Sequence, residues 1–280
     1  MRALSCFILS VLCASRSFPQ NTGFLHISTG VQVQFIVTDP HGRRTGEDPR
    51  GVSNPMQGTE LREIPGARYS LSSVGDSPSA DYQPSPQDLQ FEFEYRFRSP
   101  DDDGIYTVET IGTTLGPYTL FVDVSPRRGS TLQRYRKEIK GVTNINQVTK
   151  YQLTYSGIAG APVALEKIVT ANTLRQDLEN CYKLKLLGDK GFHEELSNIL
   201  DSYEKHLSRK DALKAVKELE KFHDRITKEY KEGTKSRDKR FVTADALQIL
   251  SYDVQYLTDR LHHKSKHGRG DDEKDKKPKK

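Results

Sequence analysis

Hydrophobic and polar residues alternate along much of the segment from residue 24 to residue 157, which is the period of β-strands that bury one face. In "VQVQFIV" (31–37) and "LQFEFEYRF" (89–97), every second residue is apolar. The segments "GIYTVETIG", "GPYTLFVDV" and "TKYQLTYSG" continue this series and are separated by turn residues. About six short strands without a helical period predict an antiparallel β-sandwich over residues 24–157.

A long stretch inside this region lacks the alternation. Residues 46–88 are rich in Gly, Pro and Ser, the residue types that favour turns and irregular backbone. We expect a long connection there, with one short strand near Tyr69. The stretch "SGIAGAPVA" (156–164) is composed mostly of small residues, and we expect residues 158–172 to form a linker.

Beyond the expected linker, apolar residues recur every three or four positions, which is the period of an amphipathic helix. Four segments share this pattern: "LRQDLENCYKLKLL", "FHEELSNILDSYEKHL", "ALKAVKELEKFHDRI" and "FVTADALQILSYDVQYL". Each carries a single apolar stripe, so the four must pack together to bury their stripes. The pattern predicts a small four-helix bundle over residues 173–262, and hence a multidomain β plus α chain in which a β-sandwich precedes the bundle.

Polar residues mark the expected starts of three of these helices. Thr173 and Gln176 have the spacing of a capping box for the first helix, and Ser208 and Asp211 have it for the third. Thr243 is the expected N-cap of the fourth helix. Residues 263–280 contain almost no apolar residue, which predicts a disordered, charged tail.

The N-terminus has the pattern of a secretory signal. Arg2 precedes the apolar run "ALSCFILSVLCA" (3–14), which is shorter than the ~20 residues that cross a bilayer. We expect residues 1–17 to be a signal peptide and the protein to be secreted, extracellular or periplasmic, with no membrane span. Cys6 and Cys13 lie in this signal, so Cys181 would remain without an internal disulfide partner; its place on a helical stripe predicts burial.

Both halves of the chain resemble known modules. The four helical segments resemble the bacterial FIMAH domain, a C-terminal module of secreted proteins. The stretches "VTDPHGRRTGED", "EIPGARYS" and "GIYTVETIGTTLGPYTL" are similar to bacterial pre-peptidase C-terminal-like β-sandwiches. The resemblance implies a non-catalytic protein that binds or attaches to a surface glycan, the matrix or a protein partner. The alternative is an accessory or regulatory subunit of a secreted enzyme, because both modules occur beside catalytic domains.

Charge adds one candidate site. The net charge is +5, but most of the excess lies after residue 262, so the total gives no argument for nucleic acid as a partner. A basic segment earlier in the chain could bind an anionic polysaccharide or a surface protein if it lies on an edge of the sandwich. Its residues are Arg127, Arg128, Arg134, Arg136, Lys137 and Lys140. The alternative is a solvated strand edge that carries lysine and arginine against aggregation.

Three consecutive aspartates, Asp101, Asp102 and Asp103, precede Gly104. An EF-hand loop with Gly104 at its sixth position would need a carboxylate at Thr110, so an EF-hand is excluded. A calcium site that combines the aspartates with a distant carboxylate such as Asp39 stays open beside the alternative of a turn into the next strand. Calcium is the one cofactor that we consider.

The sequence lacks the common catalytic arrangements. "HEELS" (193–197) has Ser197 where a zinc protease motif needs its second histidine. The sequence also contains neither a Gly-x-Ser-x-Gly nucleophile elbow nor a Gly-rich phosphate loop. We therefore expect no enzymatic activity.

Overall fold

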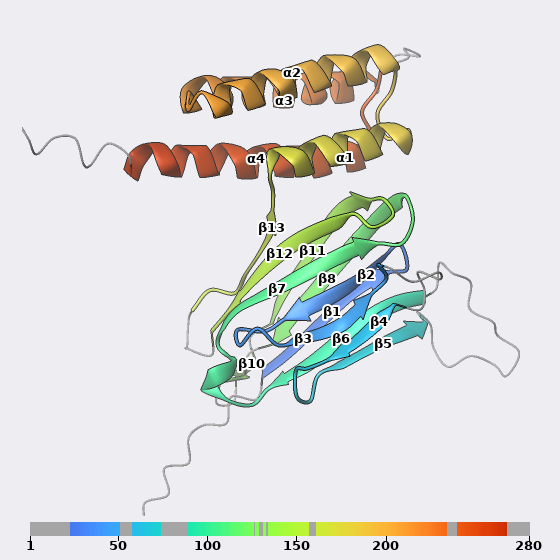
Figure 1. Ribbon diagram of the computed structural model, residues 1–280, viewed down its shortest axis with the longest axis vertical. Coiled ribbons are helices and arrows are strands. Elements are labelled where there is room, and N and C mark those ends of the chain that lie inside the picture. Colours follow the sequence, from blue (N-terminus) through green and yellow to red (C-terminus); the bar gives the residue numbers. More distant parts are fainter. Residues whose placement is uncertain are drawn as a thin grey trace, which may run out of the picture.

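The computed structural model shows two antiparallel sheets and four helices within the residues that it describes (Figure 1). Those residues are 23–50, 58–73, 89–125, 127–128, 131–132, 134–156, 161–233 and 240–267. The expectation of a mixed β plus α chain is confirmed. The expected signal peptide and the part of the expected tail after His267 lie outside the described residues.

The first sheet has five strands in the order β11-β8-β1-β6-β5. Their bounds are β1 Gly23–Gly30, β5 Arg68–Ser73, β6 Leu89–Phe97, β8 Gly116–Ser125 and β11 Tyr135–Thr143. A short ribbon of β9 and β10 lies between β8 and β11 in the chain. Its strands are Arg127–Arg128 and Thr131–Leu132.

The second sheet has six strands in the order β13-β12-β7-β2-β3-β4. Their bounds are β2 Val33–Thr38, β3 Arg44–Asp48, β4 Thr59–Arg62, β7 Gly104–Gly112, β12 Val148–Tyr155 and β13 Ala164–Ile168. A 3-10 turn, Pro100–Asp102, leads into β7.

The two sheets share one hydrophobic core, to which alternate residues of each strand contribute. In β6, Phe91, Phe93, Tyr95 and Phe97 are buried, as the alternation predicts. The ring of Phe97 stacks on that of Tyr155 from the other sheet, with centroids 3.7 Å apart. Aromatic packing therefore joins the two sheets.

The stretch expected to be irregular contains more regular structure than its composition indicates. Within residues 46–88 the structure has β4, β5 and the end of β3, where we expected one short strand. The strands β4 and β5 are edge strands, and most of their residues are exposed or half-buried. Edge strands need little apolar alternation, so the sequence pattern missed one of them.

The prediction of a linker over residues 158–172 is wrong for Ala164–Ile168, which form strand β13. This strand pairs with β12 over Lys150–Thr154. Leu165 and Val169 are buried, and Lys167 lies between them at an inward-facing position. A lysine in a buried position breaks the apolar alternation, which explains why the sequence pattern did not predict this strand.

The four helices share a second hydrophobic core, which includes Cys181. Their bounds are α1 Ala171–Lys183, α2 Lys190–Ser208, α3 Ala212–Gly233 and α4 Ala244–His267. The fourth helix thus continues five residues beyond the expected bundle, into the segment expected to be a disordered tail. In the described part of the chain, no helix has the length and hydropathy that crossing a membrane requires.

Two of the expected helix starts need correction. Thr170, not Thr173, is the N-cap of α1, and the capping box joins Thr170 to Thr173. Asp211 accepts a hydrogen bond from Lys214 N at the start of α3, whereas Ser208 is the last residue of α2. The Thr243 cap is confirmed, because its hydroxyl accepts a hydrogen bond from Ala246 N.

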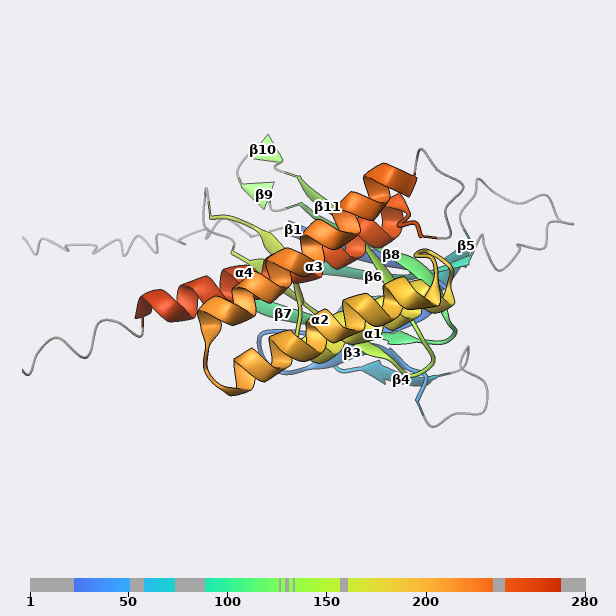
Figure 2. The same cartoon turned by 90° about the horizontal axis from the view of Figure 1, so that it is seen from above.

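The helices lie against one edge of the two-sheet unit (Figures 1 and 2). The helices α1 and α4 contact β11, and α2 and α3 form the layer farther from the sheets. The edge strands β11 and β13 are themselves linked, because Leu165 N donates to the Tyr135 hydroxyl and Lys137 Nζ donates to Leu165 O. The helices thereby cover strand edges that would otherwise be open to pairing with another chain.

Candidate functional site

The outer face of the five-stranded sheet carries a cluster of arginines. Because β6 turns alternate side chains to opposite faces, burial of Tyr95 and Phe97 places Glu94, Arg96 and Arg98 on the outer face. These three residues are exposed. On the neighbouring strand β5, Arg68 is exposed as well and lies directly opposite Glu94 in the strand register.

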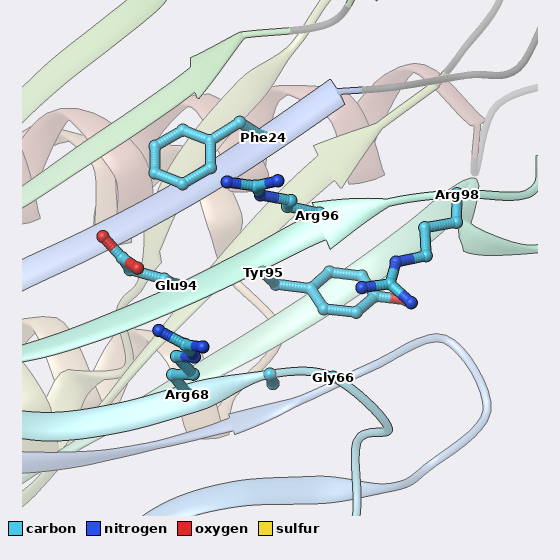
Figure 3. A pocket seen from close by; sticks show the side chains of 8 residues that line it. Phe24, Gly66, Arg68, Glu94, Tyr95, Arg96 and Arg98 are labelled. Carbon is cyan, nitrogen blue, oxygen red and sulfur yellow. The ribbon is translucent and has the colours of Figure 1, made fainter.

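These side chains surround a concavity of about 380 Å³, which we call the arginine pocket (Figure 3). Its lining comprises Phe24, Gly66, Ala67, Arg68, Glu94, Tyr95, Arg96 and Arg98. Arg96 lies opposite Phe24 on β1. Directly opposed residues of antiparallel strands have Cβ atoms about 5 Å apart, so the guanidinium of Arg96 and the ring of Phe24 can contact the same ligand.

Gly66 forms part of the floor beside Arg98. It has a φ of 78°, a conformation that favours glycine, and a Cβ atom built there would lie 3.6 Å from Nη2 of Arg98. The turn between β4 and β5 therefore brings backbone close to the guanidinium without a side chain between them.

The electrostatics of the arginine pocket are strongly unbalanced. Its lining contains three guanidinium groups and a single carboxylate, that of Glu94. The side chains of Arg68, Arg96 and Arg98 have no ion-pair or hydrogen-bond partner in the part of the chain that the structure describes. By contrast, Arg43, Arg50 and Arg134 are each held by an aspartate. The pocket thus presents guanidinium donors that are available to a ligand.

A buried carboxylate fixes the end of β6 that carries Arg98. Asp102 is 7% exposed, and its carboxylate accepts hydrogen bonds from the backbone N of Arg98 at 2.6 Å and of Ser99 at 2.9 Å. The hydroxyl of Tyr95 donates to the same carboxylate at 2.6 Å. Burial and the neighbouring Asp102 raise the pKa of Tyr95, so its hydroxyl stays protonated as a donor. Asp102 therefore sets the position of the backbone from which Arg98 extends.

This arrangement can recognise anions. The guanidinium fork of arginine matches carboxylate, sulfate and phosphate groups with two parallel hydrogen bonds. The ring of Phe24 adds an apolar surface beside Arg96 and stacks with the His26 ring at 6.2 Å. No group of three or more His, Cys, Asp or Glu side chains that could hold a metal ion occurs among the described residues.

The structure separates the residues of the predicted basic segment. Arg134 is bound to Asp123 through two nitrogens, Lys137 donates to Leu165 O, and Lys140 pairs with Asp245 of α4 at 2.8 Å. The remaining residues are Arg136, which is exposed on β11, and Arg127 and Arg128 of β9, whose side chains lie outside the described part. The segment does lie at a sheet edge, but three of its cations already have protein partners.

The three aspartates also have separate roles. Asp102 is buried, Asp103 accepts a hydrogen bond from Ser156 Oγ at 3.2 Å, and Asp101 is exposed. The distant carboxylate of Asp39 is held by Arg43 and the backbone N of His41. The aspartates form the 3-10 turn into β7, and the structure does not gather them into a calcium-binding group.

Sequence reasoning missed the arginine pocket. Its signal was present in "LQFEFEYRFR", because the polar positions between the buried aromatics include Arg96 and Arg98. Arg68 and Phe24 could not be assigned to the same site without the pairing of β5 and β1 with β6.

Comparison of the chain with protein-family models, with curated proteins and with solved structures finds no match. The chemistry of the arginine pocket therefore has to be inferred from its own residues.

Proposed function

We propose that the chain is a non-catalytic, secreted binding protein for an anionic polysaccharide, with the arginine pocket as its binding site. In this proposal, its two halves are a β-sandwich of the pre-peptidase C-terminal-like kind and a FIMAH-like four-helix bundle. The observation that carries the proposal is the set of three exposed guanidinium groups that have no partner among the described residues and lie around one concavity beside the Phe24 ring.

An acidic polysaccharide suits this chemistry in two respects. Its sugar rings carry carboxylate, sulfate or phosphate groups, which arginine binds through its planar fork. Its rings also present apolar C–H faces, which can pack on Phe24. A volume of about 380 Å³ lies in the range of small-ligand sites and leaves room for a short stretch of the polymer.

The lining of the pocket favours binding over turnover. Hydrolysis of a glycosidic bond generally uses two carboxyl groups, and the pocket has only Glu94. Its three arginines are hydrogen-bond donors without acceptor atoms. The Tyr95 hydroxyl is occupied by Asp102.

The proposal is tested by calorimetric titration of the protein with polygalacturonate, whose charges are carboxylates, and with neutral dextran as the matched polymer. We expect binding to polygalacturonate alone, and weaker binding at high salt because the attraction is electrostatic. Arg96→Gln and Arg98→Gln should each weaken the affinity about tenfold, the effect of losing one charged hydrogen bond.

Arg136→Gln is the matched control, because Arg136 is an exposed arginine of the basic segment outside the pocket. We expect its affinity to equal that of the unsubstituted protein. Equal binding by Arg96→Gln, or a loss confined to Arg136→Gln, would contradict the proposed site.

A further inference from the structure

A lysine is fully buried where the sheets meet the helices. Lys167 lies on β13, and its side chain is 2% exposed. Two carboxylates face it, Asp177 of α1 at 1% exposure and Asp253 of α4 at 0%. Of the ion pairs among the described residues, those of Lys167 alone have both partners almost completely excluded from water.

The amine of Lys167 lies at hydrogen-bond distance from both carboxyl groups. Nζ of Lys167 lies 2.5 Å from Oδ2 of Asp177 and 2.6 Å from Oδ1 of Asp253. The second contact places the carboxyl carbon of Asp253 next to Nζ, as an attack of the amine on that carbon requires. The other oxygen of Asp177 accepts a hydrogen bond from Gln147, which holds that carboxylate in place.

The surroundings exclude water. The alternate residues on either side of Lys167 are Leu165 of β13, which belongs to the core of the sheets, and Val169, just after β13, which belongs to the core of the helices. The backbone N of Lys167 donates to the Tyr252 hydroxyl of α4 at 2.9 Å. The amine is therefore enclosed at the junction of two hydrophobic cores.

The carboxyl group of Asp253 has a raised pKa. Burial raises the pKa of Asp253 well above its ordinary value; Lys167 opposes this effect, and Asp177 adds to it. Oδ2 of Asp253 is buried and has no hydrogen-bond partner in the described part of the chain. Burial alone would lower the pKa of Lys167, but the two carboxylates raise it, so the resting amine is charged.

We propose that Lys167 and Asp253 condense spontaneously in the folded protein to form an intramolecular amide bond, with Asp177 as the proton acceptor. This inference is independent of the anion-binding site. It rests on the burial of the three groups and on the two distances from the amine.

The reaction balances within the cluster. Oδ2 of Asp177 first takes one proton from the ammonium, which replaces two buried charges with two neutral groups. The neutral amine then attacks Cγ of the protonated Asp253 carboxyl. The C–N bond forms, the C–O bond to the hydroxyl breaks, and one water leaves with that hydroxyl and a proton from the amine. Asp177 ends protonated, and no oxidant, reductant or cofactor is required.

Asp253 is the expected partner because burial favours its protonated carboxyl, which has a hydroxyl to lose. In this proposal Asp177, whose Oδ2 also contacts the amine, takes the proton. The bond would join β13 directly to α4 and close a covalent ring around α1, α2 and α3. A cross-link between residues so distant in the chain restricts the unfolded state strongly. It would also fasten the helical part covalently to the sheets.

Lys140 and Asp245 provide an internal comparison. They also join a strand to α4, with 2.8 Å between Nζ and Oδ1, but their side chains are 37% and 50% exposed. Water stabilises the charged forms of both groups, so no amide should form there.

The test is the intact mass of the purified, denatured protein. We expect a mass lower than that of the sequence by one water, in essentially all molecules. Trypsin should then release residues 151–175 joined to residues 241–260, because an acylated Lys167 is not cleaved. Lys167→Arg, which keeps the charge but is not acylated, and Asp253→Ala should each have the full mass. Lys140→Arg, the matched control, should still lack one water.

Two results would overturn the inference. If the unsubstituted protein has the mass of its sequence without the loss of one water, no bond forms. This measurement needs no variant, so a failure of a variant to fold cannot affect it. A missing water with residues 151–175 joined to residues 176–183 would place the bond at Asp177 and refute the assignment to Asp253.

Discussion

At the scale of single residues, three buried polar side chains each hold a segment of backbone or join two elements. Asp102 holds the end of β6, and Lys167 connects β13 to α1 and α4. Asp39 holds the turn between β2 and β3 through Arg43 and His41. Each charge is surrounded by specific donors or acceptors, as burial requires.

Asp102 leads to a test of its anchoring role. Asp102→Ala leaves three donors without their acceptor, and we expect the free energy of unfolding to fall by about 3 kcal/mol in urea titrations. Asp102→Asn keeps one acceptor oxygen and should recover part of the loss. Asp101→Ala is the control, because the neighbouring Asp101 is exposed and its change should have almost no effect. A loss for Asp101→Ala as large as that for Asp102→Ala would contradict the anchoring role.

Residue roles were the hardest part to predict from the sequence. The turn at Asp101 to Asp103 was one of two open alternatives, and the structure shows it as a 3-10 turn capped by Ser99. Which of the three carboxylates turns inward depends on where its donors lie, namely the Tyr95 hydroxyl and the backbone N of Arg98. The folded backbone sets the positions of these donors. The inward position of Lys167 could not be predicted, because lysine is rarely buried without partners and both partners are distant in sequence.

At the scale of elements, the strands and helices with strong periodicity were predicted well. The alternation in β2 and β6 and the apolar stripes of the four helices identified each element. The elements that the pattern missed are β13, with a buried lysine, and the exposed edge strand β4. Whether these segments form strands depends on the strands beside them rather than on their own composition.

The contact between α2 and α3 gives a prediction for acid stability. Nε and Nη2 of Arg225 bind the two carboxylate oxygens of Glu195 at 2.5 and 3.0 Å. Hydrogen bonds from Arg225 lower the pKa of Glu195 below its ordinary value of 4.5. A lowered folded-state pKa means that the pair stabilises the protein above pH 4.5 and loses this contribution as the pH falls through the folded-state value.

Glu195→Gln should therefore destabilise the protein at neutral pH, but not in acid. Because the side chain of Glu195 is 36% exposed, solvent screening should limit the loss to about 1 kcal/mol or less. Urea unfolding at the two pH values measures this difference. Glu194→Gln, which alters an exposed pair with Lys190, should change little at either pH. A loss for Glu195→Gln that persists in acid would show that packing, and not the ion pair, is responsible.

At the scale of the whole molecule, the helices and the arginine pocket occupy different parts of the sheet. Figure 1 shows the helices beside β11, the first strand in the sheet order. The residues that line the pocket come from β1, β6, β5 and the adjoining loops, from the middle of that order to its other end. Among the described residues, the helices therefore do not cover the pocket. This arrangement follows from strand order, which no local sequence pattern specifies.

The central claim is that the arginine pocket binds an acidic polysaccharide, and NMR of the arginine side chains tests it most directly. The Nε–H signals of the protein are followed during titration with short oligomers of galacturonate. We predict that the signals of Arg68, Arg96 and Arg98 shift together with one affinity, while the signal of Arg134, which is bound to Asp123, stays in place. Shifts confined to Arg134 and Arg136, with the pocket signals unchanged, would contradict the claim.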